Sequence, residues 1–301
     1  MPYIKRFLKT ANNEKAAIFL QNLGMSSAKA QRAIDKMRIY EEDSVVRQKN
    51  QLLNGKIYMV DYECHPKGLR PLFEDENIAI FDKPSGVLAH PNGRDCLYSL
   101  YDEIWHLYGK EAAVAHRLDR ETSGLIAVAK NKKYQNILKS LFESRAVCKS
   151  YLALVFGRVK EDFVINCPIT KGDQNSFISI KMSVSSDGKE AITKIEPIGY
   201  FNNNDMTLIR ATPLTGRQHQ IRVHLFHVKH PIVGDPLYGV SDELADRYLL
   251  GSLDMDERLK ATGATRLCLH ANWLKFECNN KIYEIESKID ASDEFIRALP
   301  I

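Results

Sequence analysis

The stretch that decides the fold is residues 115–129, Ala115-His116-Arg117-Leu118-Asp119-Arg120-Glu121-Thr122-Ser123-Gly124-Leu125-Ile126-Ala127-Val128-Ala129. Its second half, from Gly124 to Ala129, alternates larger aliphatic residues with small ones, which predicts a short buried β-strand. Its first half is polar and predicts a turn that holds Asp119 at the edge of a sheet. Proteins commonly present reactive side chains from such rigid edges. Asp119 is therefore the first candidate for a functional group.

The chemistry of Asp119 depends on its charged neighbours. Arg117 and Arg120 flank it, and a nearby cation favours the ionised form of a carboxylate. An ionised aspartate can act as a nucleophile or stabilise the positive charge that develops at an anomeric carbon when a glycosidic bond breaks. The alternative is a structural aspartate that caps a turn and pairs with arginine. From the residue types alone, this structural role is the favoured interpretation.

Length and composition limit the class of protein. The chain has 301 residues, 44% hydrophobic and 27% charged, as expected for a globular protein of two domains. It has no apolar run near the roughly 20 residues that a membrane span needs. No apolar core follows the charges of the first six residues, so we expect no secretory signal and a cytoplasmic location.

The cysteines predict neither disulfides nor a zinc site. No two of them form a C-x-x-C pair, and their spacings match no zinc pattern. We interpret them as free thiols in a reducing compartment, and a catalytic cysteine is the disfavoured alternative. The six are Cys64, Cys96, Cys148, Cys167, Cys268 and Cys278.

Positive charge is concentrated at the front of the chain. Residues 1–70 contain 13 Lys and Arg against 7 Asp and Glu, a balance of +6, so with +4 overall the remainder carries −2. A basic front on a nearly neutral body suggests an appended module that binds a polyanion. A solvated basic surface without a partner explains the same numbers, and charge alone does not separate the two.

The front of the chain predicts a small α/β domain over residues 1–64. Two short helices are expected, at 14–24 and from the Ser26-Ser27 cap onward, followed by short strands at 38–40, 44–46 and 57–60 and a turn at Asn54-Gly55. The predicted inner faces are Ala17, Ile18, Leu20 and Leu23 in the first helix and Ala30, Ala33, Ile34 and Met37 in the second.

This order of elements resembles the RNA-binding fold named after ribosomal protein S-four. The resemblance implies that Lys29, Arg32 and Lys36, on the outer face of the second helix, contact phosphates. Ordinary helix solvation is their structural alternative.

After a linker at 65–72, residues 73–301 predict a second domain. The pattern indicates a strand at 78–81 that enters a hairpin, with its second strand from Val87. Helices are expected at 97–108, from an Asn131 cap onward, near 221–228, in a helical insert at 240–262, and at the C-terminus after Asp290 or Ser292. Further strands are expected at 149–156 and through 158–213, with turns at Gly172-Asp173, Asp187-Gly188 and Asn279-Asn280.

Several other classes of site are disfavoured. His219, His224, His227 and His230 suggest a metal site together with Asp235, but no two of these histidines are four residues apart, as in a zinc-binding helix. The glycines form neither a dinucleotide-binding nor a P-loop pattern, and there is no nucleophile elbow for acyl transfer. Surface or substrate-facing histidines are the preferred interpretation.

Four ordered segments carry a family resemblance. Residues 116–124 read H-R-L-D-R-E-T-S-G, 82–86 read D-K-P-S-G, 149–155 read K-S-Y-L-A-L-V, and 214–224 read L-T-G-R-Q-H-Q-I-R-V-H. In this order they resemble the motifs of the RluA-type pseudouridine synthases, and the segments 230–239 and 266–271 also fit. The resemblance covers about 73–285.

The resemblance implies an α+β fold and a set of roles. The catalytic domain would hold a mixed, largely antiparallel sheet with flanking helices. Asp119 would attack the ribose or assist glycosidic cleavage, Tyr151 would stack on the uracil and help remove the carbon 5 proton, and Arg222 would hold Asp119 ionised. Arg117 would fill the gap left by the flipped base. The remaining polar residues of the matched motifs, His116, Arg217 and His219, are assigned to RNA binding.

The implied reaction is the isomerisation of uridine to pseudouridine, which needs no cofactor, nucleotide or metal. The expected partner is ribosomal RNA of the large subunit, with tRNA as the alternative, and the expected state is a monomer away from membranes. Two other classes stay open: a non-catalytic RNA-binding or ribosome-assembly factor, and a metal-dependent hydrolase built on the histidine cluster. The structural alternatives are strand core for Tyr151, a solvated Lys149 and a surface charge at Arg222.

Overall fold

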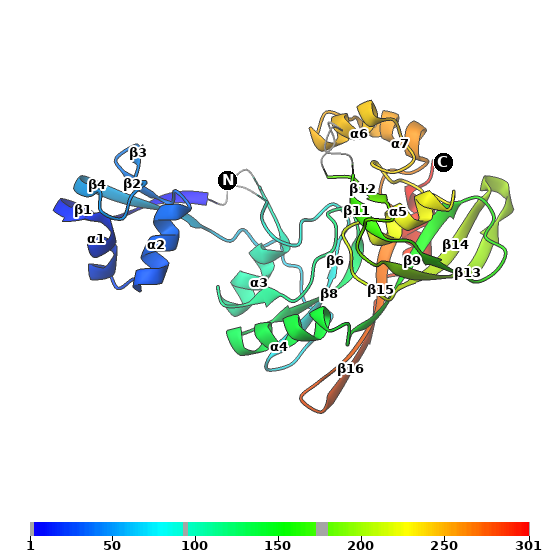
Figure 1. Ribbon diagram of the computed structural model, residues 1–301, viewed down its shortest axis with the longest axis horizontal. Coiled ribbons are helices and arrows are strands. Elements are labelled where there is room, and N and C mark those ends of the chain that lie inside the picture. Colours follow the sequence, from blue (N-terminus) through cyan, green and yellow to red (C-terminus); the bar gives the residue numbers. More distant parts are fainter. Residues whose placement is uncertain (1–2, 93–95, 173–179, 301) are drawn as a thin grey trace. The chain divides into compact units, whose positions relative to one another are not determined.

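The computed structural model describes residues 3–92, 96–172 and 180–300 (Figure 1). The chain divides into two compact units, Met1–Lys67 with Pro91–Tyr98, and Gly68–His90 with Ser99–Ile301. The division after Lys67 lies inside the predicted linker. The segment Pro91–Tyr98 differs from the prediction, which assigns it to the second domain. None of the helices formed by the described residues is both long and apolar enough to cross a membrane.

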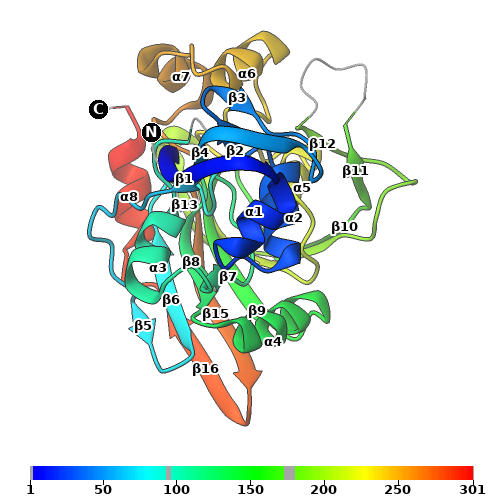
Figure 2. The same ribbon diagram turned by 90° about the vertical axis from the view of Figure 1, so that its left-hand side faces the viewer.

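The first unit is a four-stranded sheet with two helices on one face (Figures 1 and 2). The strand order is β1-β4-β2-β3. Ser26 begins α2 by accepting the N–H of Lys29, as the sequence predicts. The elements are β1 (Tyr3–Lys15), α1 (Ala16–Asn22), α2 (Ser27–Asp35), β2 (Ile39–Glu41), β3 (Ser44–Val45) and β4 (Leu52–Tyr62).

The turn predicted in this unit is wrong, and one of its strands was not predicted. Asn54-Gly55 is no turn, because Gly55 lies within β4 and pairs with Ala11 of β1. The strand β1 itself was not expected. Irregularities in its register, between Phe7 and Lys9 and again further on, interrupt the two-residue alternation that would reveal a strand. Pairing with β1 over the whole length of β4 overrides the local preference of Asn-Gly for a turn.

The buried face of α1 also differs from the prediction. Ala16, Phe19 and Leu20 are buried, whereas Ile18 is 50% and Leu23 is 38% exposed. The phase of this short helix is set by how Phe19 packs with the sheet, which periodicity over seven residues does not define. In the second predicted face, Met37 follows the end of α2 and is 44% exposed.

The second unit contains a large, mostly antiparallel sheet, which confirms the predicted fold class. The path β10-β13-β14-β9-β15-β8-β6-β5 has β7 and β16 attached, and only the β8–β15 pair on it is parallel. The strands are β5 (Phe73–Glu74), β6 (Ile78–Lys83), β7 (Ala113–Val114), β8 (Ser123–Ala129), β9 (Cys148–Phe156), β10 (Phe163–Asn166), β13 (Ile192–Phe201), β14 (Met206–Pro213), β15 (Leu269–Cys278) and β16 (Lys281–Glu286). The strands β11 (Ile169–Lys171) and β12 (Met182–Val184) form a separate two-stranded arm.

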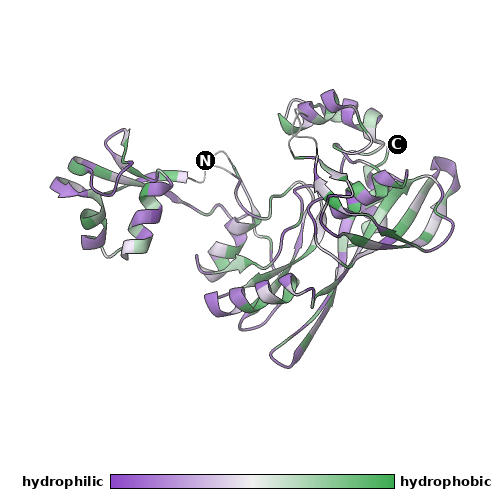
Figure 3. Ribbon diagram, viewed as in Figure 1, coloured by the Kyte–Doolittle hydropathy of each residue, from purple (hydrophilic) through white to green (hydrophobic). Residues whose placement is uncertain are grey.

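Helices cover both faces of the sheet at β8, which is why this strand is buried throughout. Leu125 and Ala127 face the cluster that contains Leu138 of α4, while Ile126 and Val128 face the cluster that contains α3. The apolar residues of α4 pack into this core, and hydrophobic and hydrophilic residues alternate along its ribbon (Figure 3). The helices are α3 (Leu100–Tyr108), α4 (Lys132–Glu143), α5 (Gln220–His227), α6 (Asp242–Leu249), α7 (Met255–Thr262) and α8 (Ala291–Ala298).

The ends of several elements match the predictions. Asn131 caps α4, Asp290 caps α8, and Asn279-Asn280 form the turn between β15 and β16 with φ of 52° and 60°. The prediction of a hairpin after β6 is wrong. The expected second strand does not form, because Leu88 makes only an isolated bridge, and that bridge is with Ser99 rather than with β6. The predicted Gly172-Asp173 turn includes Asp173, which lies outside the described residues.

Candidate active site

Asp119 lies on the loop that leads into β8, as the sequence predicts. Leu118 anchors this loop in the core, and β8 then runs parallel to β15. Gly124 makes this close pairing possible, because its φ is +108° and a Cβ there would lie 2.4 Å from the carbonyl oxygen of Ala271. The sheet therefore fixes the position at which the loop presents Asp119.

Arg222, 103 residues further along the chain, meets Asp119 from α5. Its Nη1 donates to Oδ2 of Asp119 at 3.0 Å. Nε and Nη2 of the same guanidinium donate to the two carboxylate oxygens of Asp235, each at 2.8 Å. Arg222 is 4% and Asp235 2% exposed. The buried guanidinium of Arg222 is thus held by a two-bond ion pair with Asp235, which leaves its Nη1 directed to Asp119.

The carboxyl of Asp119 is ionised. Burial alone would raise the pKa of Asp119. Positive charge at His219 and Arg222 lowers this pKa by more than burial raises it, so the net pKa lies below the usual aspartate value. Burial and the charge of Arg222 lower the pKa of His219 to about 4, so that ring is neutral at pH 7. At neutral pH, Arg222 is therefore the cation that keeps Asp119 charged.

A cavity opens beside Asp119 and is lined by most of the predicted site residues. Tyr151 of β9 contributes a ring to its wall, and burial next to Asp119 raises the pKa of its hydroxyl, which stays protonated. A protonated phenol offers a stacking face and a hydrogen bond, and a role of Tyr151 in removing the carbon 5 proton stays a prediction. Other polar residues on the wall are Arg117, Asp119, Thr122, Lys149, Thr215, Arg217, His219, Gln220 and Arg222.

Two predicted RNA-binding residues differ in where they point. Arg117 is exposed and lines the cavity. The ring of His116 instead stacks on Phe142, with centroids 4.4 Å apart, and its Nε2 accepts the N–H of Ala127. His116 does not line the cavity, so its placement supports a role in holding the loop rather than in contacting RNA. Arg217 lines the cavity while its Nε donates to the carbonyl oxygen of Glu190.

Lysines in two matched motifs reach the site, although the sequence reasoning gave them no role. Lys149 is not simply solvated: it lines the cavity, and burial lowers the pKa of its ammonium. Lys83 is fully buried, and its Nζ donates to the carbonyl oxygens of Pro84, Val87 and Arg120 at 2.7 to 3.0 Å. Burial lowers the pKa of Lys83 to about 7, against the charges of Asp119 and Glu121. A lysine at the end of an apolar strand was the available signal.

Glu121 ties the same loop to the helical insert. Its Oε2 accepts from Nη2 of Arg258 in α7 at 2.8 Å, and its Oε1 accepts the hydroxyl of Tyr248 in α6 at 3.0 Å. Glu121 and Arg258 are both buried, with 8% and 7% exposure. The insert at 240–262 is therefore part of the support of the site, which its polar sequence does not indicate.

The remaining predicted residues lie elsewhere. Lys29, Arg32 and Lys36 belong to the first unit, where all three are exposed, and Nε of Arg32 donates to the carbonyl oxygen of Ala28 in its own helix.

The histidines considered for a metal site do not point to a common centre. His219 contacts Tyr238 and Asp119, His224 bonds Thr193 and the carbonyl oxygen of Cys167, and His230 bonds the carbonyl oxygen of Phe156. Within the described ranges, no group of three His, Cys, Asp or Glu side chains is placed to hold a metal ion.

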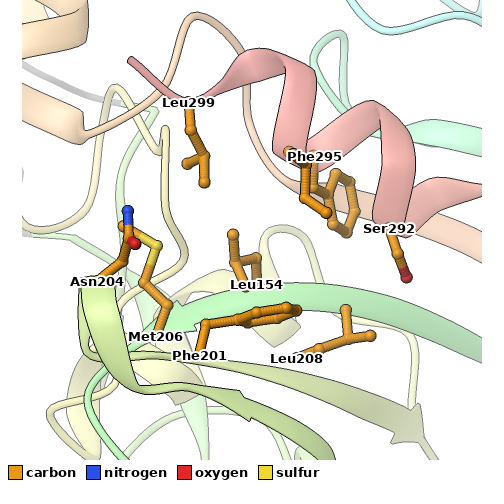
Figure 4. A pocket seen from close by; sticks show the side chains of 9 residues that line it. Leu154, Phe201, Asn204, Met206, Leu208, Ser292, Phe295 and Leu299 are labelled. Carbon is orange, nitrogen blue, oxygen red and sulfur yellow. The ribbon is translucent and has the colours of Figure 1, made fainter. Parts of the chain in front are cut away.

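A second hollow lies between α8 and strands β13 and β14 (Figure 4). It has a volume of about 220 Å³, and its wall is apolar apart from Asn204 and Ser292. With no ionisable side chain, it lacks the means for acid–base or nucleophilic chemistry. The cavity at Asp119, whose wall carries Tyr151 and Arg222 beside the paired carboxylate, is the candidate active site.

Comparisons with known proteins identify the family of the chain. Residues 77–227 match the family model described as RNA pseudouridylate synthase. An uncharacterised RNA pseudouridine synthase of Helicobacter pylori is 39% identical over 289 residues, which are 95% of this chain and 94% of that protein. Ribosomal large subunit pseudouridine synthase C of Vibrio parahaemolyticus is 34% identical over 228 residues, 74% of this chain and 66% of that protein.

A tRNA enzyme and a solved structure are also similar. The tRNA pseudouridine(31) synthase of Saccharomyces cerevisiae is 37% identical over 188 residues, 57% of this chain and 46% of that protein. The structure of human RNA pseudouridylate synthase domain containing 1 covers 75% of this chain and 86% of its own, with a TM-score of 0.58 and 23% identity. That last likeness shows the fold alone.

Proposed function

This chain belongs to the RNA pseudouridylate synthase family, and we propose that it acts on one or a few uridines of large-subunit ribosomal RNA through Asp119. As a member of the family it isomerises uridine in RNA to pseudouridine. The observation that carries the proposed site is the ion pair of Asp119 with a buried arginine at the wall of a cavity. That pair keeps the carboxylate charged where a ribose can reach it.

The geometry supports a division of roles. The bond from N1 of uracil to C1′ breaks, and a new bond joins C5 to C1′, while C5 loses a proton and N1 gains one. Asp119 either attacks the sugar or stabilises its developing positive charge, since an ionised carboxylate suits both. Tyr151 supplies a stacking face for the uracil. Arg117, exposed at the wall, is positioned to replace the flipped base in the RNA stack.

The choice of ribosomal RNA rests on similarity and on the first unit. Synthase C of Vibrio parahaemolyticus, a large-subunit enzyme by its name, matches 74% of this chain. The S-four-like assignment of the first unit, with a basic α2, also favours ribosomal RNA. The yeast tRNA enzyme is similar over a shorter part, so tRNA is the competing substrate.

The target can be mapped chemically. RNA from a strain that lacks the gene is treated with carbodiimide, and the stops of reverse transcription are compared with those of the parent strain. We expect one or a few stops to disappear from large-subunit rRNA and to return when the gene is restored. Disappearance from tRNA alone would replace the proposed substrate, and an unchanged map would contradict the proposed function.

Asp119→Asn tests the catalytic carboxylate. We expect no detectable pseudouridine at the mapped site, with RNA affinity and melting temperature close to those of the parent protein, because the amide keeps the shape but loses the charge. Chemical mapping, filter binding and thermal unfolding measure the three quantities. A large loss of stability with retained activity in the surviving folded fraction would assign Asp119 a structural role instead.

We further propose that the protein acts as a cytoplasmic monomer. The six cysteines are free thiols, which suits a reducing compartment. Light scattering of the purified protein is expected to give the monomer mass of 34.3 kDa.

A further inference from the structure

His219 lies between the catalytic carboxylate and a buried tyrosine. It immediately precedes α5, in the left-handed conformation at φ 53°, and is 8% exposed. Its Nδ1 is 3.0 Å from the hydroxyl oxygen of Tyr238, and its Nε2 is 3.8 Å from Oδ2 of Asp119. The two ring nitrogens therefore face two different partners, and their roles depend on which one carries the proton.

The hydrogen bonds around Tyr238 decide that question. Its hydroxyl oxygen accepts the N–H of Met182, at 2.8 Å, from β12 of the two-stranded arm. Burial raises the pKa of Tyr238, so the hydroxyl keeps its proton, and among the described residues Nδ1 of His219 is the acceptor within reach. A buried hydroxyl proton needs an acceptor. Because the ring is neutral at pH 7, an accepting Nδ1 leaves the proton on Nε2.

Arg222 and His219 both face the same oxygen of the Asp119 carboxylate. Arg222 donates to Oδ2 of Asp119, and Nε2 of His219 faces Oδ2 as well. Among the described residues, Oδ1 has no hydrogen-bond partner. Arg222 therefore supplies the hydrogen bond to Oδ2, while Nε2 of His219, 3.8 Å away, is too far for a second one but near enough for the dipole of an N–H there to favour this oxygen.

We propose that Tyr238 fixes His219 as the neutral Nε2–H tautomer, and that this N–H, with Arg222, turns Oδ2 of Asp119 inward so that Oδ1 is the oxygen that meets the ribose. His219 and Tyr238 are then positioning residues. The inference deepens the proposed function and rests on Asp119 being the catalytic group. It also makes the backbone of β12 part of the chain of contacts that orients Asp119.

The tautomer can be observed without any substrate. Long-range ¹H–¹⁵N spectra of the ¹⁵N-histidine-labelled full-length protein at pH 7 distinguish protonated from unprotonated ring nitrogens, and a His219→Asn spectrum identifies the signals of His219 among the nine histidines. We expect protonated Nε2 and unprotonated Nδ1. An Nδ1–H tautomer or an imidazolium would overturn the proposal. Failure of the proposed function would leave this spectrum unaffected, so the two failures are distinguishable.

Tyr238→Phe tests the hydroxyl alone, since it keeps the ring that packs under the guanidinium of Arg222. The probe is release of tritium from total RNA of the deletion strain labelled with [5-³H]uridine. We expect kcat to fall about tenfold, which is the effect of losing about one hydrogen bond. KM should stay within about twofold of the parent value. The Nε2–H signal should weaken in the same variant. An unchanged kcat would overturn the positioning role.

Two comparisons separate positioning from general damage. Tyr200→Phe removes a hydroxyl that donates to Asp205 at the surface, and it should leave kcat unchanged. His219→Gln, whose amide lies near the place of Nε2, should retain more activity than His219→Asn, whose amide lies near Nδ1. Equal loss in both histidine variants at equal stability would contradict a donor at Nε2.

Discussion

At the scale of single residues, the site depends on how one guanidinium is shared. Arg222 uses two of its nitrogens to bind Asp235 and one to bind Asp119. The geometry of the fork fixes where the third nitrogen points, so Asp235 positions the pair of Arg222 with Asp119 without touching Asp119. A point-like ammonium cannot reproduce this, because it lacks the planar spread of donors.

Arg222→Lys should therefore be damaging although it keeps the charge. We expect the free energy of unfolding to fall by at least about 1.5 kcal/mol, the low end for removal of a hydrogen bond to a charged group. Activity should fall as well, since Asp119 loses its fixed donor. Urea unfolding and tritium release measure the two effects. Arg210→Lys, at the exposed pair with Glu196, is the control and should change neither.

Buried histidines make stability depend on pH. Burial lowers the pKa of His116 to about 3 and those of His219 and His270 to about 4. In the unfolded chain these rings titrate near 6.5. Between these values the unfolded state binds more protons than the folded state, so stability is complete above about pH 6.5 and is lost as pH falls toward 4.

The expected outcome is a falling urea midpoint between pH 6.5 and 4, at constant ionic strength. Asp119 does not cause this loss, because its own pKa is lowered and it stays ionised across the window. His116→Gln should flatten the curve, whereas His106→Gln, at an exposed position of α3, should not. A midpoint constant down to pH 4 would contradict the neutral buried rings.

At the scale of elements, the loop that carries Asp119 is held from both sides. Lys83, at the end of β6, binds the carbonyl oxygen of Arg120, and Arg258 of α7 binds Glu121. The two residues that are held, Arg120 and Glu121, directly follow Asp119 in the sequence. Arg120 is bound from β6 and Glu121 from the helical insert. A reactive group on a loop gains the precision of a rigid element when its neighbours are fixed in this way.

Arg258→Met should destabilise the protein by about 3–5 kcal/mol, because it leaves the carboxylate of Glu121 buried without its cation. Glu121→Gln combined with Arg258→Met should recover much of that loss, since the buried charge is then absent. Thermal and urea unfolding measure both.

Helices α6 and α7 of the insert supply the control for the Glu121–Arg258 pair. Arg247 and Glu257 form a pair whose side chains are 38% and 42% exposed. Arg247→Met should cost less than about 1 kcal/mol. Equal effects at the two pairs would show that burial is not what gives the Glu121–Arg258 pair its importance.

At the scale of the whole molecule, the two compact units carry different kinds of surface. The cavity and its ion pairs lie within the second unit, while the first carries exposed positive charge on α2. Phosphate contacts give affinity without reading sequence, whereas an enzyme that modifies a base takes that single base into a pocket. We therefore expect substitutions in the first unit to change binding far more than chemistry.

Replacing Lys29, Arg32 and Lys36 by Gln should weaken RNA binding and leave kcat at saturating RNA unchanged. If all three bind phosphates, the salt dependence of log Kd should become shallower by about 0.7 for each lysine or arginine that no longer neutralises a phosphate. A matched triple of exposed lysines on α4, Lys132, Lys133 and Lys139, is the comparison. Identical slopes for the parent and the α2 triple would assign these residues to solvation.

The sequence by itself determined the family and most elements of the second unit. Apolar runs such as β8 and capped helices such as α4 depend on neighbours in the chain, and the ordered motifs identified Asp119, Tyr151 and Arg222 together. The interrupted alternation of β1 and the short α1 defeated the same reasoning, because their positions depend on pairing and packing with distant residues.

Only the tertiary structure decided how the site is assembled. The fork to Asp235, the inward turn of His116 and the hydrogen bonds of Lys83, Glu121 and Tyr238 join loops that lie far apart in the sequence. Periodicity shows which face of an element is buried, but it does not show which loops meet at a sheet edge. The orientation of Asp119 is decided there, by hydrogen bonds that form only after the chain has folded.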